Sequence, residues 1–320
     1  MGELEKIFTA AQQRLQSGEK AVFTAILETR GSAPRTTGAL MVSGGGKLLA
    51  GTVGGGPLEH FCIGEADKLG KTGEIRQFRL DHSKAGELGM VCGGSAKVLF
   101  TPVQSEELLT EGLALLKSRT PGWMALPLDG SAPYLIKEGN LPRCAAVCPE
   151  ENALVLPLLE AGRVFLIGGG HVAAELAAIL HQLEIRYLVV DDRPEFSSPD
   201  RFPGAEETFT LPLDKLADHL TGSLCPTRED AVCIMTRGHG SDTEAARFAL
   251  STSAGYIGVM GSRRKRAAMF DALEKVSCSD YAQRITSPIG LAIGAQTPAE
   301  IAVSIAAQLI QWRANHMAQD

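Results

Sequence analysis

Residues 164–193 read VFLIGGGHVAAELAAILHQLEIRYLVVDDR, and this stretch decides the expected fold. It consists of an apolar run, three glycines, an amphipathic helical segment and a second apolar run that ends in two acidic residues. Gly168, Gly170 and Ala173 fit the pattern G-x-G-x-x-G/A, and Asp191 lies 18 residues beyond Ala173. In this pattern the first glycine permits a tight turn, the second lets backbone approach a diphosphate, and the third small residue lets the helix pack closely on the strand. The stretch therefore predicts the strand–turn–helix–strand unit of a nucleotide-binding α/β domain.

The glycine turn is also the first candidate binding site. Phosphate charge would be stabilised by the free N–H groups and the positive end of the following helix. The alternative is that the glycines only make a tight turn, and a histidine at a helix start more often caps or packs than catalyses. The candidate cofactor-binding residues here are Gly168, Gly169, Gly170, His171, Asp191, Asp192 and Arg193.

Further along the chain, apolar runs continue to alternate with helical stretches. AVCIMTRG and GYIGVMGS read as strands, and the last helix is expected after Thr297, with Thr297 as its N-cap and Pro298 at its first position. Such alternation predicts a mostly parallel sheet with helices on both faces, a Rossmann-like fold. We expect this C-terminal domain to occupy residues 161–320.

Two more loops are expected at the carboxyl ends of these strands, where open parallel sheets bind ligands. The segment MTRGHGSD follows one strand, and GVMGSRRKR follows the next. The basic residues of the second segment suit a phosphate, although a solvated basic helix end is the competing interpretation. The candidate residues from these loops are Arg237, His239, Ser262 and Arg263.

The N-terminal part is unusually rich in glycine. Sixteen of the 35 glycines lie between Gly31 and Gly94, and there they separate short apolar runs that read as strands. We expect an N-terminal glycine-rich α/β domain over residues 1–104, then a helix and a connecting segment with minor strands over residues 105–160. Three glycine loops of this part would present N–H groups and small polar residues to an anionic or heteroaromatic ligand. The candidates are Arg35, Gly54, Gly55, Gly56, Glu59, Cys92, Gly93 and Gly94.

Two of these candidates have an equally ordinary interpretation. Glu59 suits the start of a helix as well as it suits a ligand. Cys92 is followed by two glycines, so its thiol would be uncrowded and able to contact a soft metal such as molybdenum or to handle sulfur. A small buried residue in a strand is the competing interpretation for Cys92.

Composition and missing motifs exclude several classes of protein. The chain has 320 residues, 44% of them hydrophobic, and a formal net charge of −6, which argues against disorder and against a general nucleic-acid binder. Its seven cysteines are odd in number and scattered, which is typical of a reduced intracellular chain. There is no G-x-S-x-G, C-x-x-C or H-E-x-x-H motif, so we expect no catalytic triad and no motif-built metal site. The acidic amphipathic start and the absence of an apolar run near 18 residues predict a cytoplasmic protein without a membrane span.

The complete set of motifs resembles the xanthine dehydrogenase accessory factor (XdhC/CoxI) family. The resemblance rests on GSAPRTTGALM, GTVGGGPLE and LGMVCGG in the first third, and on FLIGGGHVAAELA, VVDDRPEFSSPDRFP, TRGHGSD, YIGVMGSRRKR and PIGLAIGAQTPAEIAVSI in the second half. It implies a dimeric carrier of molybdenum cofactor (molybdopterin) that is not an enzyme. Such a carrier holds the cofactor while a cysteine desulfurase supplies sulfur, and then inserts it into an apo molybdenum hydroxylase.

The resemblance also has a departure and a rival. Some relatives carry a cysteine where this chain has Pro57, so any thiol role falls here on Cys92. The rival hypothesis is an NAD(P)-dependent oxidoreductase, or a nucleotide-binding sensor, that uses Gly168, Gly170, Ala173 and Asp191.

Overall fold

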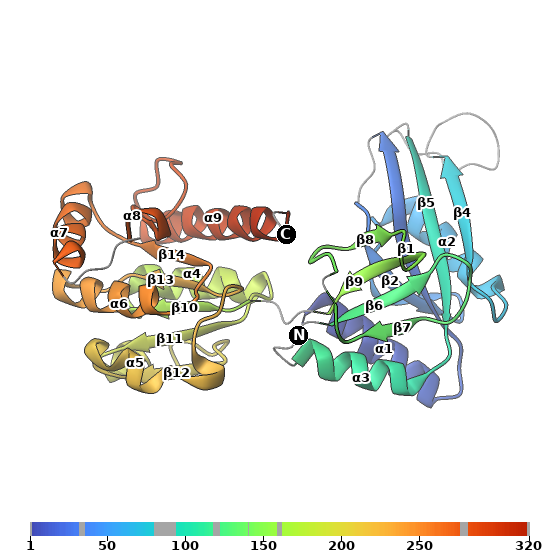
Figure 1. Cartoon of the computed structure of the whole chain (residues 1–320), viewed down its shortest axis with the longest axis horizontal. Coiled ribbons are helices and arrows are strands. Elements are labelled where there is room, and N and C mark those ends of the chain that lie inside the picture. The colour runs from blue at the N-terminus through green and yellow to red at the C-terminus, as the bar shows by residue number, and fades with distance from the viewer. Residues whose placement is uncertain are drawn as a thin grey trace. The chain divides into compact units, whose positions relative to one another are not determined.

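The computed structural model describes residues 2–31, 36–79, 94–117, 122–139, 141–158, 162–275 and 281–318, with side chains for all of these except His239, Arg263, Met317 and Ala318. The chain forms two compact units (Figure 1). One unit comprises Met1–Glu160 with Met317–Asp320, and the other comprises Ala161–His316.

An antiparallel sheet of five strands organises the N-terminal unit. Its strand order is β3-β2-β1-β5-β4. The strands are β1 (Ala21–Gly31), β2 (Leu40–Gly44), β3 (Lys47–Gly51), β4 (Glu74–Arg79) and β5 (Gly94–Val103). The first seven residues of β1 are all buried, because β1 is the central strand and both faces of the sheet are covered.

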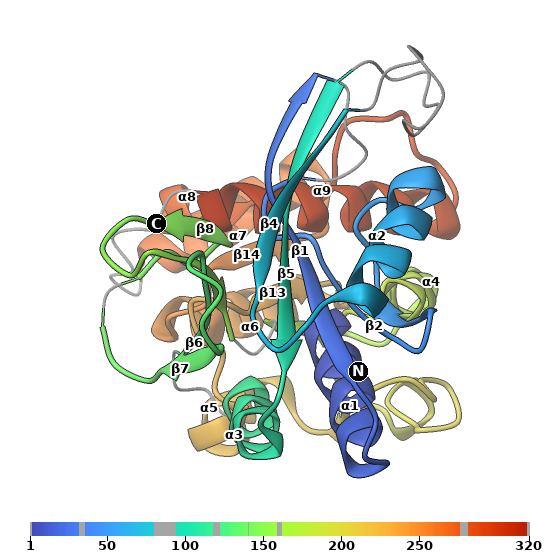
Figure 2. The ribbon, with the colours of Figure 1, turned by 90° about the vertical axis from the view of Figure 1, so that its right-hand side faces the viewer.

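Helices cover the two faces of this sheet with separate hydrophobic clusters. On one face α1 (Glu3–Gln16) and α3 (Glu106–Lys117) pack with the sheet, and the rings of Phe8 and Phe23 stack 5.8 Å apart. On the other face lies α2 (Gly56–Lys68) (Figure 2). This helix buries Leu58 and Cys62 against the sheet. Because α2 packs on this face of the sheet, the glycine loop that directly precedes α2 is held at the edge of the same face.

Residues 122–139 and 141–157 form more structure than the expected connection with minor strands. A second antiparallel sheet has the order β7-β6-β9-β8. Its strands are β6 (Trp123–Pro127), β7 (Tyr134–Ile136), β8 (Ala146–Cys148) and β9 (Ala153–Pro157). Met124 and Leu156 pack in the same hydrophobic cluster as the buried residues of α1. This distant packing stabilises the strands, although the prolines and glycines of the segment suggest an irregular connection.

The C-terminal unit contains a parallel sheet of six strands in the order β12-β11-β10-β13-β14-β15. The strands are β10 (Val164–Ile167), β11 (Tyr187–Asp191), β12 (Glu207–Thr210), β13 (Ala231–Ile234), β14 (Tyr256–Val259) and β15 (Ile285–Thr286). This is the strand order of a Rossmann sheet. Starting from β10, the chain first adds β11 and β12 on one side and then adds β13, β14 and β15 on the other side, so the strand order changes side between β10 and β13. The predicted Rossmann-like fold is confirmed.

Helices lie on both faces of the parallel sheet. One face packs against α4 (His171–Gln182) and α9 (Pro298–Ala318), and the other against α6 (His239–Ser251) and α7 (Arg263–Glu274). The shorter elements are η1 (Pro194–Phe196), η2 (Leu213–Lys215), α5 (Leu216–His219), η3 (Gly222–Leu224) and α8 (Tyr281–Arg284). Because both faces are covered, β10, β11, β13 and β14 are buried along their whole length, which explains their predominantly apolar sequences.

The start of α9 confirms the predicted cap. The Thr297 hydroxyl accepts a hydrogen bond from the Glu300 N–H at 3.3 Å, and the Glu300 carboxylate accepts one from the Thr297 N–H at 2.9 Å. This reciprocal pair is a capping box. No helix within the described ranges is both long enough and apolar enough to span a bilayer.

Candidate functional site

The predicted binding residues of the C-terminal unit meet at one edge of its sheet. Gly168 follows β10, Asp192 follows β11, Arg237 follows β13 and Ser262 follows β14. All these strands are parallel, so their carboxyl ends lie at the same edge. The strand order changes side between β10 and β13, and open α/β sheets bind ligands in the crevice at such a point.

The three glycines after β10 differ in what a side chain at each position would meet. Gly168 has φ +103°, and a Cβ there would lie 2.5 Å from the Met235 carbonyl oxygen. A Cβ on Gly169 would lie 1.7 Å from the Phe196 carbonyl oxygen. Gly170 has φ −65° and no atom within 4 Å of the position of a Cβ, so nothing inside the protein excludes a side chain. The missing side chain of Gly170 leaves an open cradle at the N-terminus of α4, which fits the approach of a ligand to the backbone.

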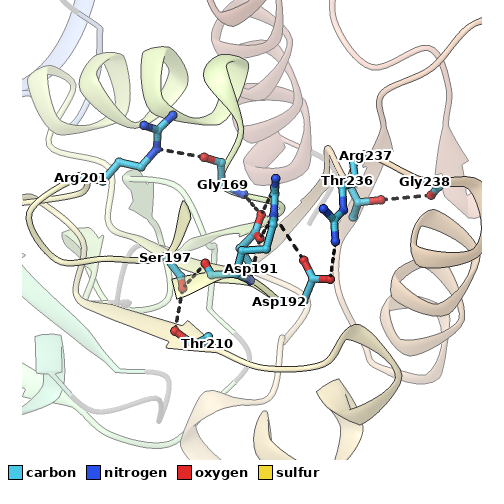
Figure 3. Close-up of polar contacts among 10 residues, drawn as sticks. Gly169, Asp191, Asp192, Ser197, Arg201, Thr210, Thr236, Arg237 and Gly238 are labelled. Carbon is cyan, nitrogen blue, oxygen red and sulfur yellow. Dashed lines mark hydrogen bonds and ion pairs between the residues drawn. The ribbon is translucent and has the colours of Figure 1, made fainter. Parts of the chain in front are cut away.

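The peptide groups of Gly169 are held from both sides (Figure 3). Its N–H donates to Oδ2 of Asp191 at 2.8 Å, and its carbonyl oxygen accepts from Nε of Arg201 at 3.1 Å. Both partners come from the neighbouring strand β11 or the segment after it. The glycine turn is therefore preorganised without any ligand.

Sequence reasoning missed the part played by the segment after β11. The guanidinium of Arg193 lies 3.6 Å from the centroid of the Phe196 ring, and that of Arg201 lies 5.2 Å from it. The Ser197 hydroxyl, 2.8 Å from that of Thr210, ties the segment to the end of β12. The alternation of arginine and phenylalanine at 193, 196, 201 and 202 is the signal that could have indicated such stacking.

Asp191 supports the turn instead of facing the crevice. The residue is 3% exposed, and its carboxylate accepts hydrogen bonds from Gly169 and from the backbone and guanidinium of Arg193. Burial raises the pKa of this carboxyl, but the hydrogen bonds from Arg193 and Gly169 outweigh burial and hold the pKa below its ordinary value. Its oxygens are already used by the chain, so a sugar hydroxyl has a better acceptor in the neighbouring Asp192.

Asp192 and Arg237 form an ion pair across the crevice. Oδ2 of Asp192 lies 3.2 Å from Nη2 of Arg237, and the two residues follow β11 and β13, the strands on either side of β10 (Figure 3). The Arg237 side chain is 63% exposed. An exposed pair of this kind contributes at most about 1 kcal/mol, so a ligand can open it at little cost.

The helix N-termini at this edge differ in their caps. Both α4 and α6 begin after a glycine, with no side-chain cap among the described residues, whereas the Ser262 hydroxyl caps α7 by accepting from the Lys265 N–H at 3.3 Å. His171 is exposed at the start of α4. The predicted side chains of His239 and Arg263 lie outside the described part of the structure. The N-termini of α4 and α6 are thus the ones that present backbone donors to the crevice.

In the N-terminal unit, Glu59 holds the glycine loop that precedes α2. Its Oε2 accepts from the Thr52 hydroxyl at 2.5 Å and from the N–H groups of Val53 and Gly55, each at 3.3 Å. Gly54, Gly55 and Gly56 all have positive φ, which is the left-handed region that favours glycine. The arrangement gives Glu59 a structural role in shaping the loop, and Thr52 is a partner that sequence reasoning missed.

The replacement Glu59→Gln tests that role. A glutamine can place its one oxygen where Oε2 accepts all three hydrogen bonds, but it removes the negative charge that strengthens them. We therefore expect the free energy of unfolding of the N-terminal unit to fall by about 1–2 kcal/mol. Guanidinium unfolding followed by the fluorescence of Trp123, in a Trp312→Phe background, measures it. The exposed Glu107→Gln in the first turn of α3 is the matched control. Equal stability of the two variants would contradict the assignment.

Three of the predicted N-terminal residues, Arg35, Cys92 and Gly93, lie outside the described residues. Gly94 begins β5 and pairs with Gly31 of β1. A Cβ on Gly94 would lie 2.2 Å from the Arg30 carbonyl oxygen. Close strand pairing is therefore sufficient to explain glycine at position 94.

The described thiols differ in accessibility. Burial raises the pKa of both the Cys62 and the Cys233 thiol to about 12, and Cys144 is exposed. Within the described ranges, no group of three His, Cys, Asp or Glu side chains is placed to hold a metal ion. Cys148 is also buried, and burial raises the pKa of its thiol. These three buried thiols are therefore not suited to a soft metal or to sulfur transfer.

This difference predicts a pattern of alkylation. With a pKa of about 12, the thiolate fraction of Cys62 or Cys233 at pH 8 is about one in ten thousand. We expect iodoacetamide to label Cys144 in the native protein and to leave Cys62 and Cys233 unlabelled, as read by peptide mass spectrometry. Labelling in urea is the control for reagent and peptide recovery. Native labelling of Cys62 at the rate of Cys144 would refute the burial argument.

The two units match two family models. The model described as the XdhC Rossmann domain matches residues 164–309, and the model described as the XdhC and CoxI family matches residues 14–81. A Bacillus halodurans crystal structure described as a xanthine dehydrogenase has a TM-score of 0.78 at 23% identity, covers 97% of this chain and 96% of its own, and shows the same fold.

Three relatives from bacteria are similar in sequence. A Bacillus subtilis protein described as a probable xanthine dehydrogenase subunit is 24% identical, over 93% of this chain and 95% of its own length. The Escherichia coli protein YqeB is 25% identical over 97% of this chain, which spans 46% of that longer protein. The Escherichia coli molybdenum cofactor insertion chaperone PaoD is 30% identical over 41% of each chain. With the two family models matching in order along both units, the chain belongs to the XdhC and CoxI family.

Proposed function

We propose that this protein carries molybdenum cofactor and inserts it into a xanthine dehydrogenase-type molybdenum hydroxylase. The observation that carries the proposal is the cradle at Gly170, where an absent side chain opens the N-terminus of α4 at the strand reversal of the sheet. Such a cradle suits the phosphate of a bound ligand. The similarity to a cofactor insertion chaperone and to a probable xanthine dehydrogenase component supports molybdopterin, which carries a phosphate, as that ligand.

The residues at the crevice have distinct parts in this proposal. Backbone N–H groups after Gly170 bind the phosphate, and Asp191 and Arg201 keep the turn in place through Gly169. Arg237 leaves its ion pair with Asp192 and binds the ligand instead, because this exposed ion pair is easily opened. Binding and release need no covalent step, so the protein acts without turnover of its own.

The remaining parts of the proposal concern partners and the thiol. We infer a homodimer, an apo molybdenum hydroxylase as recipient, and a cysteine desulfurase as the source of sulfur. Cys92 remains the proposed contact for molybdenum or sulfur, because the two glycines that follow it in the sequence would leave its thiol uncrowded.

The test is the cofactor content of protein purified from a molybdenum-replete host. We expect about one molybdenum and one pterin per chain, together with stimulated reconstitution of an apo hydroxylase. Gly170→Leu should lose the cofactor, whereas Gly64→Leu, at another open glycine on α2, should retain it. Folded protein that neither holds the cofactor nor stimulates reconstitution would overturn the proposal.

A nicotinamide-dependent oxidoreductase is the second candidate, favoured by the Rossmann strand order and the glycine pattern. Against it, the Asp191 carboxylate is buried and already bonded to Gly169 and Arg193. Titration with NADH and NADPH, followed by nicotinamide fluorescence, separates the two. Tight nicotinamide binding without molybdenum would reverse the ranking.

A further inference from the structure

The side of α9 that points away from the sheet is apolar and exposed. This helix covers one face of the parallel sheet (Figure 1), where Ile305 and Leu309 are buried in the hydrophobic cluster. On its opposite side Val303 is 51% exposed and Ile310 is 48% exposed. Together with Ile293, in the segment before the helix, they are the three most exposed large apolar side chains among the described residues. Exposed apolar side chains that gather in one patch mark an interaction surface, whereas single scattered ones do not.

The apolar patch continues along the helix. Ala299, Val303, Ala307, Ile310 and Ala314 follow one another at intervals of four, four, three and four residues, which keeps them on one side of an α-helix. We call these five residues the outer face of α9. They extend over about 22 Å of the helix axis. The short alanine side chains between and beside the two larger ones allow a second helix to approach closely.

The outer face of α9 is symmetric about its own midpoint. Val303 and Ile310 lie equally far from the midpoint of residues 299–314, and so do the end residues Ala299 and Ala314. An interface between two copies of one chain about a twofold axis needs this property, because residue i of one copy contacts residue j of the other while j contacts i. In an antiparallel pair of α9 helices, each Val303 would face Ile310 of the partner subunit.

The charges of α9 also fit a second copy of the chain. Between Glu300 and Arg313 the helix has no Asp, Glu, Lys, Arg or His residue, so two copies of the outer face would meet without repulsion between like charges. Residues 300 and 313 are themselves equally far from the midpoint of the face. In the antiparallel pair, Glu300 would therefore lie at the level of Arg313 of the partner subunit, and each end of the pair would carry charges of opposite sign.

We propose that the outer face of α9 forms an antiparallel, twofold-symmetric interface with the same face of a second copy of this chain. Burial of Val303 and Ile310 between the copies supplies the hydrophobic contact. The proposal deepens one part of the proposed function, the homodimer, by naming the surface that forms it.

Light scattering after size-exclusion chromatography tests the interface. We expect the wild-type protein to have the mass of two chains, and Val303→Asp and Ile310→Asp each to have the mass of one, because the twofold axis would place two carboxylates in the contact. Leu183→Asp is the matched control and should remain a dimer, since Leu183 is 44% exposed but lies at the end of α4. Circular dichroism verifies that each variant is folded. A monomeric wild type, or a Val303→Asp variant that remains a dimer, would overturn the proposal.

Disulfide cross-linking tests the antiparallel register without a destabilising charge. Chains with Val303→Cys and chains with Ile310→Cys are produced together in a background that lacks the exposed thiol, Cys144→Ser. We expect mild oxidation to join one variant to the other. Neither variant alone should be joined to itself, because two copies of one position would lie about 10 Å apart along the pair, beyond the reach of a disulfide.

A cross-link in either variant alone, or no cross-link in the mixture, would overturn the proposed register and interface. Molybdenum content is measured separately. A cross-linked dimer that never retains the cofactor supports the interface and overturns the proposed function alone, whereas wild-type protein that retains the cofactor as a monomer overturns the interface alone.

Discussion

Replacement of Gly169 by alanine is expected to lower the free energy of unfolding of the C-terminal unit by about 3 kcal/mol or more. The added Cβ would lie 1.7 Å from the Phe196 carbonyl oxygen, and that obstacle is backbone, which no rotamer change can remove. If Phe196 moves, its stacking with Arg193 and Arg201 is disturbed. If Gly169 moves, its hydrogen bonds to Asp191 and Arg201 are disturbed. Either adjustment disrupts the turn.

The matched control is the neighbouring replacement Gly170→Ala. Gly170 has φ −65° and open space where the Cβ would be placed. The free energy of unfolding of the Gly170→Ala variant should therefore stay within about 0.5 kcal/mol of the wild-type value. The chain has two tryptophans, and only Trp312 lies in the C-terminal unit. In a Trp123→Phe background, its fluorescence during guanidinium unfolding reports on that unit. Equal stability of the alanine variants at 169 and 170 would refute the steric argument.

The alternating units of the C-terminal half could be predicted because their signals are local. The run 164–193 contains strand, turn, helix and strand in sequence, and the structure confirms each as β10, the glycine turn, α4 and β11. The second sheet of the N-terminal unit could not be predicted from such local signals. Strands β6 and β9 are separated by 25 residues rich in turn formers, and they are stabilised by packing with α1, which precedes them by more than 100 residues. No short window of sequence contains that information.

The same distinction applies to the site. The glycine spacing located the turn, since Gly168 has a positive φ that favours glycine at that position. The contacts of Gly169 come from Asp191 and Arg201, which are 22 and 32 residues away in the chain. A sequence pattern predicts that an acid follows the second strand, but only the packing decides that Asp191 supports the turn and that Asp192 faces the crevice.

Asp191→Ala is the second replacement with a large expected effect. It would leave the Gly169 N–H without its acceptor and remove the buried partner of Arg193. Because the Arg193 side chain is 23% exposed and can regain water or turn to Asp192, we expect a loss of about 2–4 kcal/mol rather than the full cost of a buried charge. Asp192→Asn is the control, because losing the exposed ion pair with Arg237 should lower the free energy of unfolding by less than about 1 kcal/mol.

The pH dependence of stability shows whether the charge of the Asp191 carboxylate, and not only the volume of the side chain, stabilises the turn. Hydrogen bonds hold the pKa of Asp191 in the folded protein below the ordinary value of about 3.9, so the unfolded chain takes up the proton first as the pH falls. The stability that Asp191 contributes is therefore complete well above pH 4 and is lost as the pH falls through the folded-state pKa. The difference in unfolding free energy between the wild type and Asp191→Asn should be constant from pH 7 to pH 5 and shrink toward pH 3. Guanidinium unfolding at pH 7, 5, 4 and 3, followed by Trp312 fluorescence, measures this difference. A difference that stays the same down to pH 3 would mean that the Asp191 charge does not stabilise the turn.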